Sequence, residues 1–218
     1  MQSCRKTIIL NTICVVLVLL AGPIRFIGYQ YEKFPYNKLI CILFSAAAFI
    51  WIYQIRKRVI HPEELRYLMT IAHLMIFWII LRTIKYECLV YDQFLARFAW
   101  YLYYIPQVFC VVFMLLTVLH IGKPYNQPIN RKWKLIYIPS VVIVAGILTN
   151  DLHQLAFRFP EGLEAWKRAD YTYGPFYYAA VLWVAVLFLA ILIVVFVAAV
   201  CPENVKKYGC RCCHFLLL

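Results

Sequence analysis

The most chemically varied stretch of the sequence is LTNDLHQLAFRFP, residues 148–160, which directly follows an apolar run. Asn150, Asp151 and His153 bring an amide, a carboxylate and an imidazole close together. At the outer end of a membrane helix such groups could hold a polar ligand or a proton. The same groups also end helices by bonding to unpaired backbone atoms. The pattern therefore leaves a sensing role and a structural role open.

Three arginines, Arg82, Arg97 and Arg158, fall at the predicted outer surface of the membrane. As a set they could attract an anionic ligand, whereas a single arginine at this depth commonly extends its charged end to the interface. Glu87 and Asp92 lie in the same predicted loop as Arg82 and could pair with it.

His73 lies in the middle of an apolar run, where its ring must find a polar partner. A hydrogen bond to a neighbouring helix is the simpler interpretation, and a functional role inside the membrane is the alternative. A metal site needs three or four ligands, and only Asp151 and His153 are near one another in sequence. The tail contains Cys210, Cys212, Cys213 and His214. Their spacing is tighter than the C-x2-C pairs of usual zinc sites, and the alternative is that these thiols simply face lipid. We therefore predict no metal and no cofactor.

Catalytic motifs are missing from the sequence. It contains no Gly-rich phosphate loop, no H-E-x-x-H and no G-x-S-x-G. We therefore expect no catalysis within these residues and do not expect the chain to be an enzyme.

The elements that must position these groups are apolar helices. Hydrophobic residues make up 65% of the chain and charged residues 15%, against roughly 45–50% and about 25% in soluble proteins. A bilayer, not water, is the solvent that suits such a surface. We predict an all-α integral membrane protein, a bundle of about six transmembrane helices. The predicted spans are residues 7–24, 38–55, 65–84, 98–121, 135–148 and 176–200.

Local signals refine these boundaries. The pair Gly22-Pro23 predicts the end of the first span. Pro62, followed by two glutamates, predicts a helix start, because acids in the first turn interact favourably with the helix dipole. Pro106 predicts a kink, because proline removes one backbone hydrogen bond and crowds the preceding turn.

Basic residues predict the orientation. With six spans, the side that carries the N-terminus has thirteen Lys and Arg against three acidic residues, and the other side has nine against seven. Lys and Arg are retained in cytoplasmic loops. The N-terminus and residues 201–218 are therefore predicted inside, the latter as a short tail or the start of a further helix. The loop after residue 148 is predicted outside.

The net charge of +12 fits attraction to anionic lipid headgroups better than nucleic-acid binding, since no soluble basic domain is present. We expect the lipid bilayer and an unidentified extracytoplasmic ligand as partners and no nucleic acid; a homodimer is compatible with the sequence. The apolar C-terminal run that stops at residue 218 leads us to expect the front portion of a longer protein, or a truncated or frameshifted product.

Four segments carry a family resemblance: ARFAWYLYYIP (residues 96–106), HIGKP (120–124), YIPSVVIVAGILTNDLHQLAFRFP (137–160) and DYTYGPFYY (170–178). In these segments the chain resembles the N-terminal seven-transmembrane sensor region of bacterial membrane histidine kinases. Relative to that region it has one additional helix at the front and lacks the last two helices and any kinase domain. Eight spans and six spans both end inside, so the resemblance and the charge count agree.

The resemblance implies a multi-pass sensor module of a bacterial two-component system in the inner membrane. An extracytoplasmic signal would pass through helix rearrangement to a cytoplasmic output. The alternative is a small membrane transporter or channel subunit, which should place ionisable residues inside several spans; only His73 clearly qualifies. A membrane enzyme would need a cluster of His, Asp or Glu, of which the sequence offers only Asp151 and His153.

Overall fold

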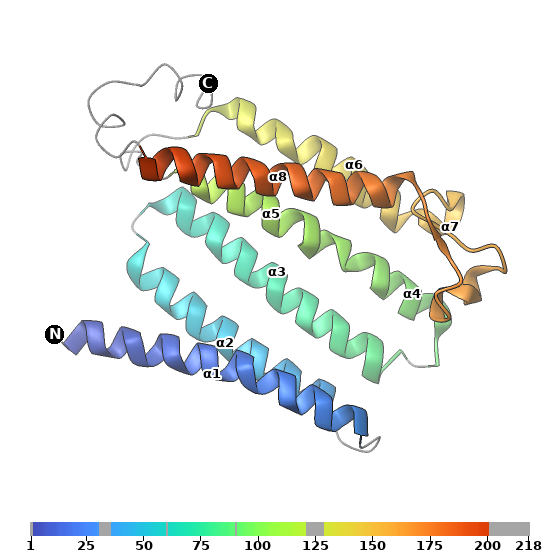
Figure 1. Cartoon of the computed structure of the whole chain (residues 1–218), viewed down its shortest axis with the longest axis horizontal. Coiled ribbons are helices and arrows are strands. Elements are labelled where there is room, and N and C mark those ends of the chain that lie inside the picture. The colour runs from blue at the N-terminus through green and yellow to red at the C-terminus, as the bar shows by residue number, and fades with distance from the viewer. Residues whose placement is uncertain (1, 31–35, 60, 90, 121–128, 201–218) are drawn as a thin grey trace. The chain divides into compact units, whose positions relative to one another are not determined.

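The chain folds almost entirely into helices (Figure 1). The computed structural model describes residues 2–30, 36–59, 61–89, 91–120 and 129–200. The elements are α1 (Gln2–Gln30), α2 (Tyr36–Arg58), α3 (Pro62–Glu87), α4 (Gln93–Leu102), α5 (Tyr104–Val118), η1 (Arg131–Ile136), α6 (Tyr137–Leu148), α7 (Asn150–His153), β1 (Phe157–Arg158), η2 (Leu163–Lys167), β2 (Thr172–Tyr173) and α8 (Pro175–Val200).

The prediction of an all-α membrane protein is confirmed. Among the described residues, four helical segments are long and apolar enough to cross a bilayer, Tyr36–Arg58, Pro62–Glu87, Gln93–Val118 and Pro175–Ala198, and Ile9–Ile24 is a shorter apolar helix. Large apolar side chains stay exposed on them; Leu182 is 66% and Phe196 68% exposed. Such surface is covered by lipid tails in a membrane.

Helix α6 differs from the other predicted spans in length. It has 12 residues, which reach only about 18 Å, whereas the hydrocarbon core of a bilayer is about 30 Å thick. The 3-10 helix η1 directly precedes it and extends the helical rod toward the N-terminal side. The predicted span of residues 135–148 therefore corresponds to the end of η1 followed by α6.

The Gly22-Pro23 pair does not end the helix, although the apolar part of α1, Ile9–Ile24, stops at the predicted end of the first span. Helix α1 continues through Pro23 to Gln30. Proline removes a single helical hydrogen bond, and a membrane helix tolerates this loss because local adjustment satisfies the freed backbone groups.

The predicted span of residues 98–121 is two helices with a break at Tyr103. Helix α4 ends at Leu102 and α5 begins at Tyr104, and the Tyr103 backbone N–H donates to the Trp100 carbonyl. Pro106 has no N–H for the carbonyl of Leu102, and its ring crowds that carbonyl. The break therefore lies one turn before the proline that predicts it.

The chain divides into two compact units. The N-terminal unit comprises Met1–Ile60 and Ala72–Tyr103, and the C-terminal unit comprises His61–Ile71 and Tyr104–Leu218. In the N-terminal unit α1 packs along α2, and the Cys14 thiol lies 3.8 Å from the Ala47 carbonyl oxygen. Asn37 and Gln54 are buried polar residues near the two ends of α2.

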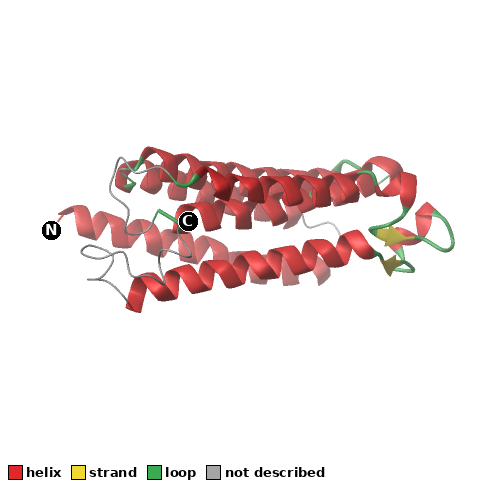
Figure 2. Ribbon diagram, turned by 90° about the horizontal axis from the view of Figure 1, so that it is seen from above, coloured by secondary structure: helices red, strands yellow, loops and turns green. Residues whose placement is uncertain are grey.

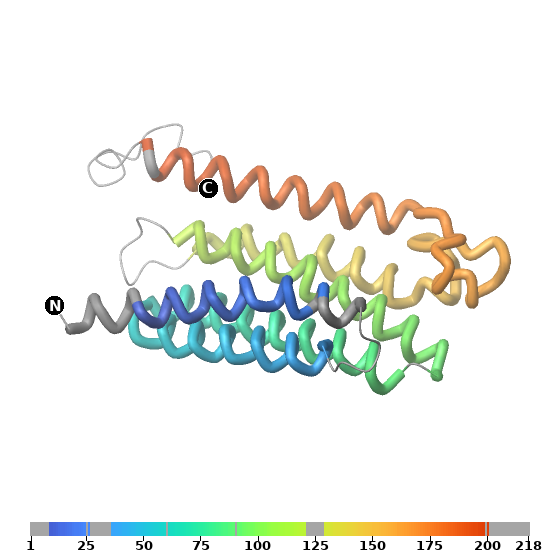
Figure 3. Tube along the Cα trace, turned by 60° about the horizontal axis from the view of Figure 1, so that its bottom comes forward, coloured from blue at the N-terminus to red at the C-terminus, as the bar shows by residue number. Residues whose placement is uncertain are grey.

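Helices α5, α6 and α8 pack against one another in the C-terminal unit (Figures 1 and 3). One face of α5 forms the centre of the core, which Leu187 and Ile191 of α8 and Ile129 complete. The contributing residues of α5 and the turn after it are Val111, Val112, Leu115, Leu116 and Leu119. The Trp183 indole of α8 donates to the Ser140 hydroxyl of α6 at 2.9 Å, so a partly buried polar contact joins α8 to α6.

Residues 149–174, which we call the cap, fill the connection between α6 and α8. The cap contains α7, η2 and an antiparallel pair of very short strands, β1 and β2, in which Phe157 is opposite Tyr173 and Arg158 opposite Thr172. Figure 2 shows the strands beyond the end of α8. The long polar loop of the sequence is therefore a folded element.

Gly146 allows α6 to approach α8. A Cβ atom at position 146 would lie 2.3 Å from Cε1 of Phe176, which is too close for any real contact. We expect Gly146→Ala to lower the free energy of unfolding in detergent by about 1–3 kcal/mol, because it overpacks a filled site. Phe176→Leu in the same chain should recover part of the loss.

Ala145→Leu is the matched control, since Ala145 is the adjacent residue on an exposed face of α6. Equal destabilisation by Gly146→Ala and Ala145→Leu would contradict close packing of α6 against α8.

Candidate functional site

Asn150 holds the turn by which the chain leaves α6. Its side chain is fully buried. Its Oδ1 accepts hydrogen bonds from the backbone N–H groups of Ala156 at 2.8 Å and Phe157 at 2.9 Å, and its Nδ2 donates to the Phe157 carbonyl at 3.0 Å. One side-chain amide thus supplies both an acceptor and a donor to the backbone of the cap. A ligand that used this amide would have to break these bonds.

The His153 imidazole closes a second chain of hydrogen bonds at the same helix end. The Leu155 N–H donates to His153 Nδ1 at 2.9 Å, so Nδ1 carries no proton. Nε2–H then donates to the Thr149 hydroxyl at 3.1 Å, and that hydroxyl donates to the Ala145 carbonyl at 2.8 Å. The geometry therefore fits the neutral ring, and protonation of Nδ1 would remove the bond to Leu155.

Gln154 reverses the chain direction after α7. Its backbone is left-handed, with φ 51°, and its N–H donates to the Asn150 carbonyl at 2.7 Å. Its side-chain Oε1 accepts from the Phe159 N–H at 3.1 Å. Asn150, His153 and Gln154 thus each bond a backbone N–H group of residues 155–159.

Gly174 fastens the other end of the cap to this turn. Its N–H donates to the Ala156 carbonyl at 2.8 Å, and the Phe176 N–H donates to the Leu155 carbonyl at 3.2 Å. A Cβ atom at Gly174 would lie 2.1 Å from the Leu155 carbonyl oxygen, so only glycine allows this approach. The start of α8 is therefore bound directly to the exit from α6.

Aromatic rings form the interior of the cap. Phe157 is fully buried and is in ring contact with Tyr104 of α5 at 6.0 Å and with Tyr171 and Tyr173 of the cap. Burial raises the pKa of the Tyr171 hydroxyl, and the neighbouring Tyr173 raises it further. Phe157 therefore joins this aromatic cluster of the cap to Tyr104 of α5.

The outer surface of the cap carries a shallow depression of about 500 Å³. Arg158 is its charged residue and is exposed. Asp151 is half-buried in the first turn of α7 and does not line the depression. The lining residues are His153, Gln154, Leu155, Arg158, Phe159, Pro160 and Thr172.

The other predicted residues belong to the N-terminal unit. Arg97 is buried, with its guanidinium carbon 5.8 Å from the centre of the Phe94 ring. Arg82 is half-buried, with its guanidinium carbon 5.8 Å from the centre of the Tyr86 ring. His73 lies on an exposed face of α3. Only Arg158 of the three arginines is in the same unit as Asn150, Asp151 and His153.

The pairing considered for Arg82 does not occur. Glu87 instead lies 3.5 Å from the ammonium group of Lys38. Asp92 accepts from the Leu95 N–H at 2.9 Å and caps α4. The short side chain of Asp92 suits a helix cap, which satisfies a backbone donor that would otherwise be unpaired.

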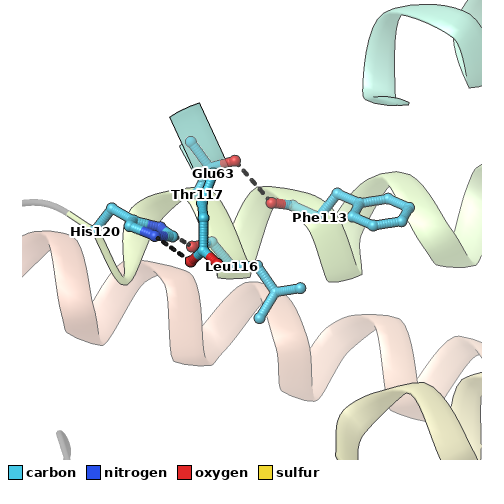
Figure 4. Close-up of polar contacts among 5 residues, drawn as sticks. All are labelled: Glu63, Phe113, Leu116, Thr117 and His120. Carbon is cyan, nitrogen blue, oxygen red and sulfur yellow. Dashed lines mark hydrogen bonds and ion pairs between the residues drawn. The ribbon is translucent and has the colours of Figure 1, made fainter. Parts of the chain in front are cut away.

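A pair that the sequence reasoning missed joins the buried His120 to the half-buried Glu63 (Figure 4). The His120 side chain is 1% exposed, and its Nε2 lies 3.3 Å from Oε2 of Glu63. Nδ1 bonds the Leu116 carbonyl at 2.9 Å and therefore carries a proton. The contact between Nε2 and Oε2 thus joins the first turn of α3 to the turn after α5. The His61 ring, 4.5 Å from that of His120, belongs to the same cluster.

The signal for this pair was present but weak. Glu63 lies in the first turn of α3 and His120 follows α5, and both positions fall on the predicted cytoplasmic side. Their separation of 57 positions along the chain gives no local spacing to recognise.

Metal ligands do not gather within the described part of the chain: no group of three or more His, Cys, Asp or Glu there could hold an ion. Cys210, Cys212, Cys213 and His214 lie outside the described residues.

The family model for the N-terminal 7TM region of histidine kinase matches residues 38–212. The chain belongs to this family. Comparison with curated proteins and with solved structures gives no match. The family match confirms the resemblance inferred from the sequence and extends it toward the N-terminus, to the first turn of α2. The match to this sensor region includes the cap and the His120–Glu63 pair, whereas α1 precedes it.

In this sensor region, Asn150→Ala should destabilise the cap strongly. It would leave the buried N–H groups of Ala156 and Phe157 without an acceptor, at about 1–3 kcal/mol for each buried group. We expect faster hydrogen exchange at residues 155–159 and a lower unfolding temperature in detergent.

Gln107→Ala is the control, because Gln107 is an exposed amide on α5. Unchanged exchange at residues 155–159 in Asn150→Ala would show that the amide does not hold the cap.

Proposed function

We propose that the chain is the sensor module of a bacterial signal-transduction protein, located in the inner membrane with its N-terminus in the cytoplasm. The cap is then extracytoplasmic and receives the signal, and the opposite end of the C-terminal unit delivers it to a cytoplasmic output. The family match supports a membrane sensor region. The geometry of the C-terminal unit supports the direction of transmission.

Helix α5 is the observation that carries this proposal. At its first residue, Tyr104 contacts Phe157 in the core of the cap. Just after its end, His120 meets Glu63. The 15 residues of α5 span roughly 22 Å, which is most of a bilayer core. A single helix therefore connects the cap to the His120–Glu63 pair.

The proposed transmission from the cap to the end of α5 passes through helices that pack directly against one another. The cap is bonded to α6 through Asn150 and to α8 through Gly174, so a change in the cap moves the ends of both helices. Both helices pack on α5, whose buried face continues to Leu119. Packed interiors have few voids and transmit displacement efficiently.

The depression at Arg158 is the proposed place for the signal. Arg158 offers an exposed cation there, and Gln154 and Thr172 offer polar groups, which together suit a small anionic or polar ligand. A ligand can bias the helices only by binding one arrangement of the cap more tightly than another. Asn150 and His153 then act by holding the cap in the arrangement that the ligand selects.

Helix α8 weighs against the alternative of a transporter or channel. It contains no charged residue in 26 positions. Transport pathways usually place ionisable groups inside the membrane.

Orientation can be tested at Leu152, which is 86% exposed in the cap. In a Cys88→Ser background, a membrane-impermeant maleimide added to intact cells should label Leu152→Cys fully, because the cap lies outside. Arg58→Cys, at the last residue of α2, should be labelled only after the membrane is permeabilised. The reverse pattern would overturn the orientation.

Transmission can be tested with Gly174→Ala, which must push the cap away from Leu155. In lipid nanodiscs we expect hydrogen exchange at the backbone amides of Leu119 and His120 to rise by about tenfold, equivalent to about 1.4 kcal/mol of lost protection. Lys167→Ala, an exposed residue of the same cap, should leave both amides unchanged.

Faster exchange confined to the cap in Gly174→Ala would show that the cap is not coupled to the end of α5. The proposed route of transmission would then be wrong.

A further inference from the structure

A second cavity lies in the N-terminal unit, between α2 and α3. Its volume is about 350 Å³, at the lower end of the roughly 300–1,000 Å³ of ligand pockets. Helix α3 provides one continuous stripe of its wall, with the three- and four-residue spacing of a single helix face. The stripe comprises Met75, Trp78, Ile79, Arg82, Thr83 and Tyr86.

Polarity changes along this stripe. Met75, Trp78 and Ile79, in the middle of α3, present apolar side chains, and Cys41 and Phe44 of α2 continue that surface. The cationic and hydroxyl-bearing residues of the stripe lie in its last two turns. A cavity that is apolar at the depth of the lipid tails and cationic near the end of the helix has the polarity of an anionic amphiphile.

Arg82 is a cation without a counterion in this cavity. Within the part of the chain that the structure describes, its guanidinium contacts the Tyr86 ring and forms no ion pair with an acidic side chain. The nearest acid in sequence, Glu87, is paired with Lys38. A charged group held among apolar walls is costly unless it finds a partner. An anionic ligand would provide that partner.

Neighbouring groups add to the positive character of this end. Lys85 lies over the face of Tyr86, with its ammonium 5.0 Å from the ring centre. The Thr83 hydroxyl donates to the Ile79 carbonyl, so the guanidinium of Arg82 remains the donor for a ligand. Arginine presents its donors in a planar fork that matches a carboxylate.

We propose that this cavity binds a fatty acid taken from the bilayer. The carboxylate pairs with Arg82, and the single acyl chain lies along Trp78 and Met75 toward Phe44. The modest volume favours one acyl chain over a two-chain phospholipid. This site is independent of the cap, because every residue that lines it belongs to the N-terminal unit.

The test is quenching of Trp78 fluorescence by a fatty acid brominated on its chain, added to the whole protein in detergent at a pH where the acid is ionised. Subtracting the quenching measured for Trp78→Phe from that of native protein isolates the contribution of Trp78. We expect Arg82→Gln to weaken binding of the acid by about tenfold, since it removes one partly buried charge pair. The brominated fatty alcohol should bind native protein and Arg82→Gln alike.

Arg66→Gln is the matched control, an exposed arginine on the same helix but outside the cavity; it should bind as native protein does. Arg82→Lys, which keeps the charge but loses the planar fork, should bind more weakly than native protein and more tightly than Arg82→Gln. Cys41→Phe, which fills the apolar wall and keeps Arg82, should also weaken binding.

Three results would overturn the proposal. Arg82→Gln could bind the acid as tightly as native protein does, or native protein could bind the acid and the alcohol equally tightly. A two-chain anionic phospholipid could also displace the acid fully at equal concentration.

Discussion

The C-terminal unit depends on one requirement, that the backbone be hydrogen-bonded where the chain leaves α6. At such an exit the last carbonyls of a helix and the N–H groups of the following loop lose their regular partners. Asn150 meets this requirement with a single buried amide that bonds both the N–H and the carbonyl of Phe157. With that turn fixed, Phe157 occupies the centre of the cap, and Gly174 can bring the start of α8 against Leu155. The packing of α6, α8 and α5 follows from this junction.

The same junction shows how a sensing and a structural role can share residues. His153 and Gln154 use ring and side-chain atoms to hold the backbone of the cap, yet both also line its outer depression. A ligand bound beside Arg158 would therefore contact the side chains that stabilise the fold of the cap. Binding and folding free energy are then coupled without a separate switch, because the contacts that change on binding are also those that stabilise the turn.

The sequence predicted the features that depend on local chemistry. Apolar runs located the long helices, Pro62 with its two glutamates located the start of α3, and Pro106 indicated the interruption before α5. The Gly22-Pro23 pair misled because a membrane helix tolerates one missing hydrogen bond, so α1 continues past Pro23. Elsewhere the sequence failed where distant contacts decide. The polar loop after residue 148 is folded because Asn150 and Gly174 join its two ends. The His120–Glu63 pair needed the packing of α3 and α5, which no short spacing reveals.

The His120–Glu63 pair has an electrical consequence. A rearrangement that makes or breaks this contact moves charge over a short distance only, since Nε2 and Oε2 lie 3.3 Å apart. A membrane potential does substantial work only on charge moved across much of the bilayer. The hydrogen bonding of α3 to the end of α5 can therefore change almost without regard to membrane voltage.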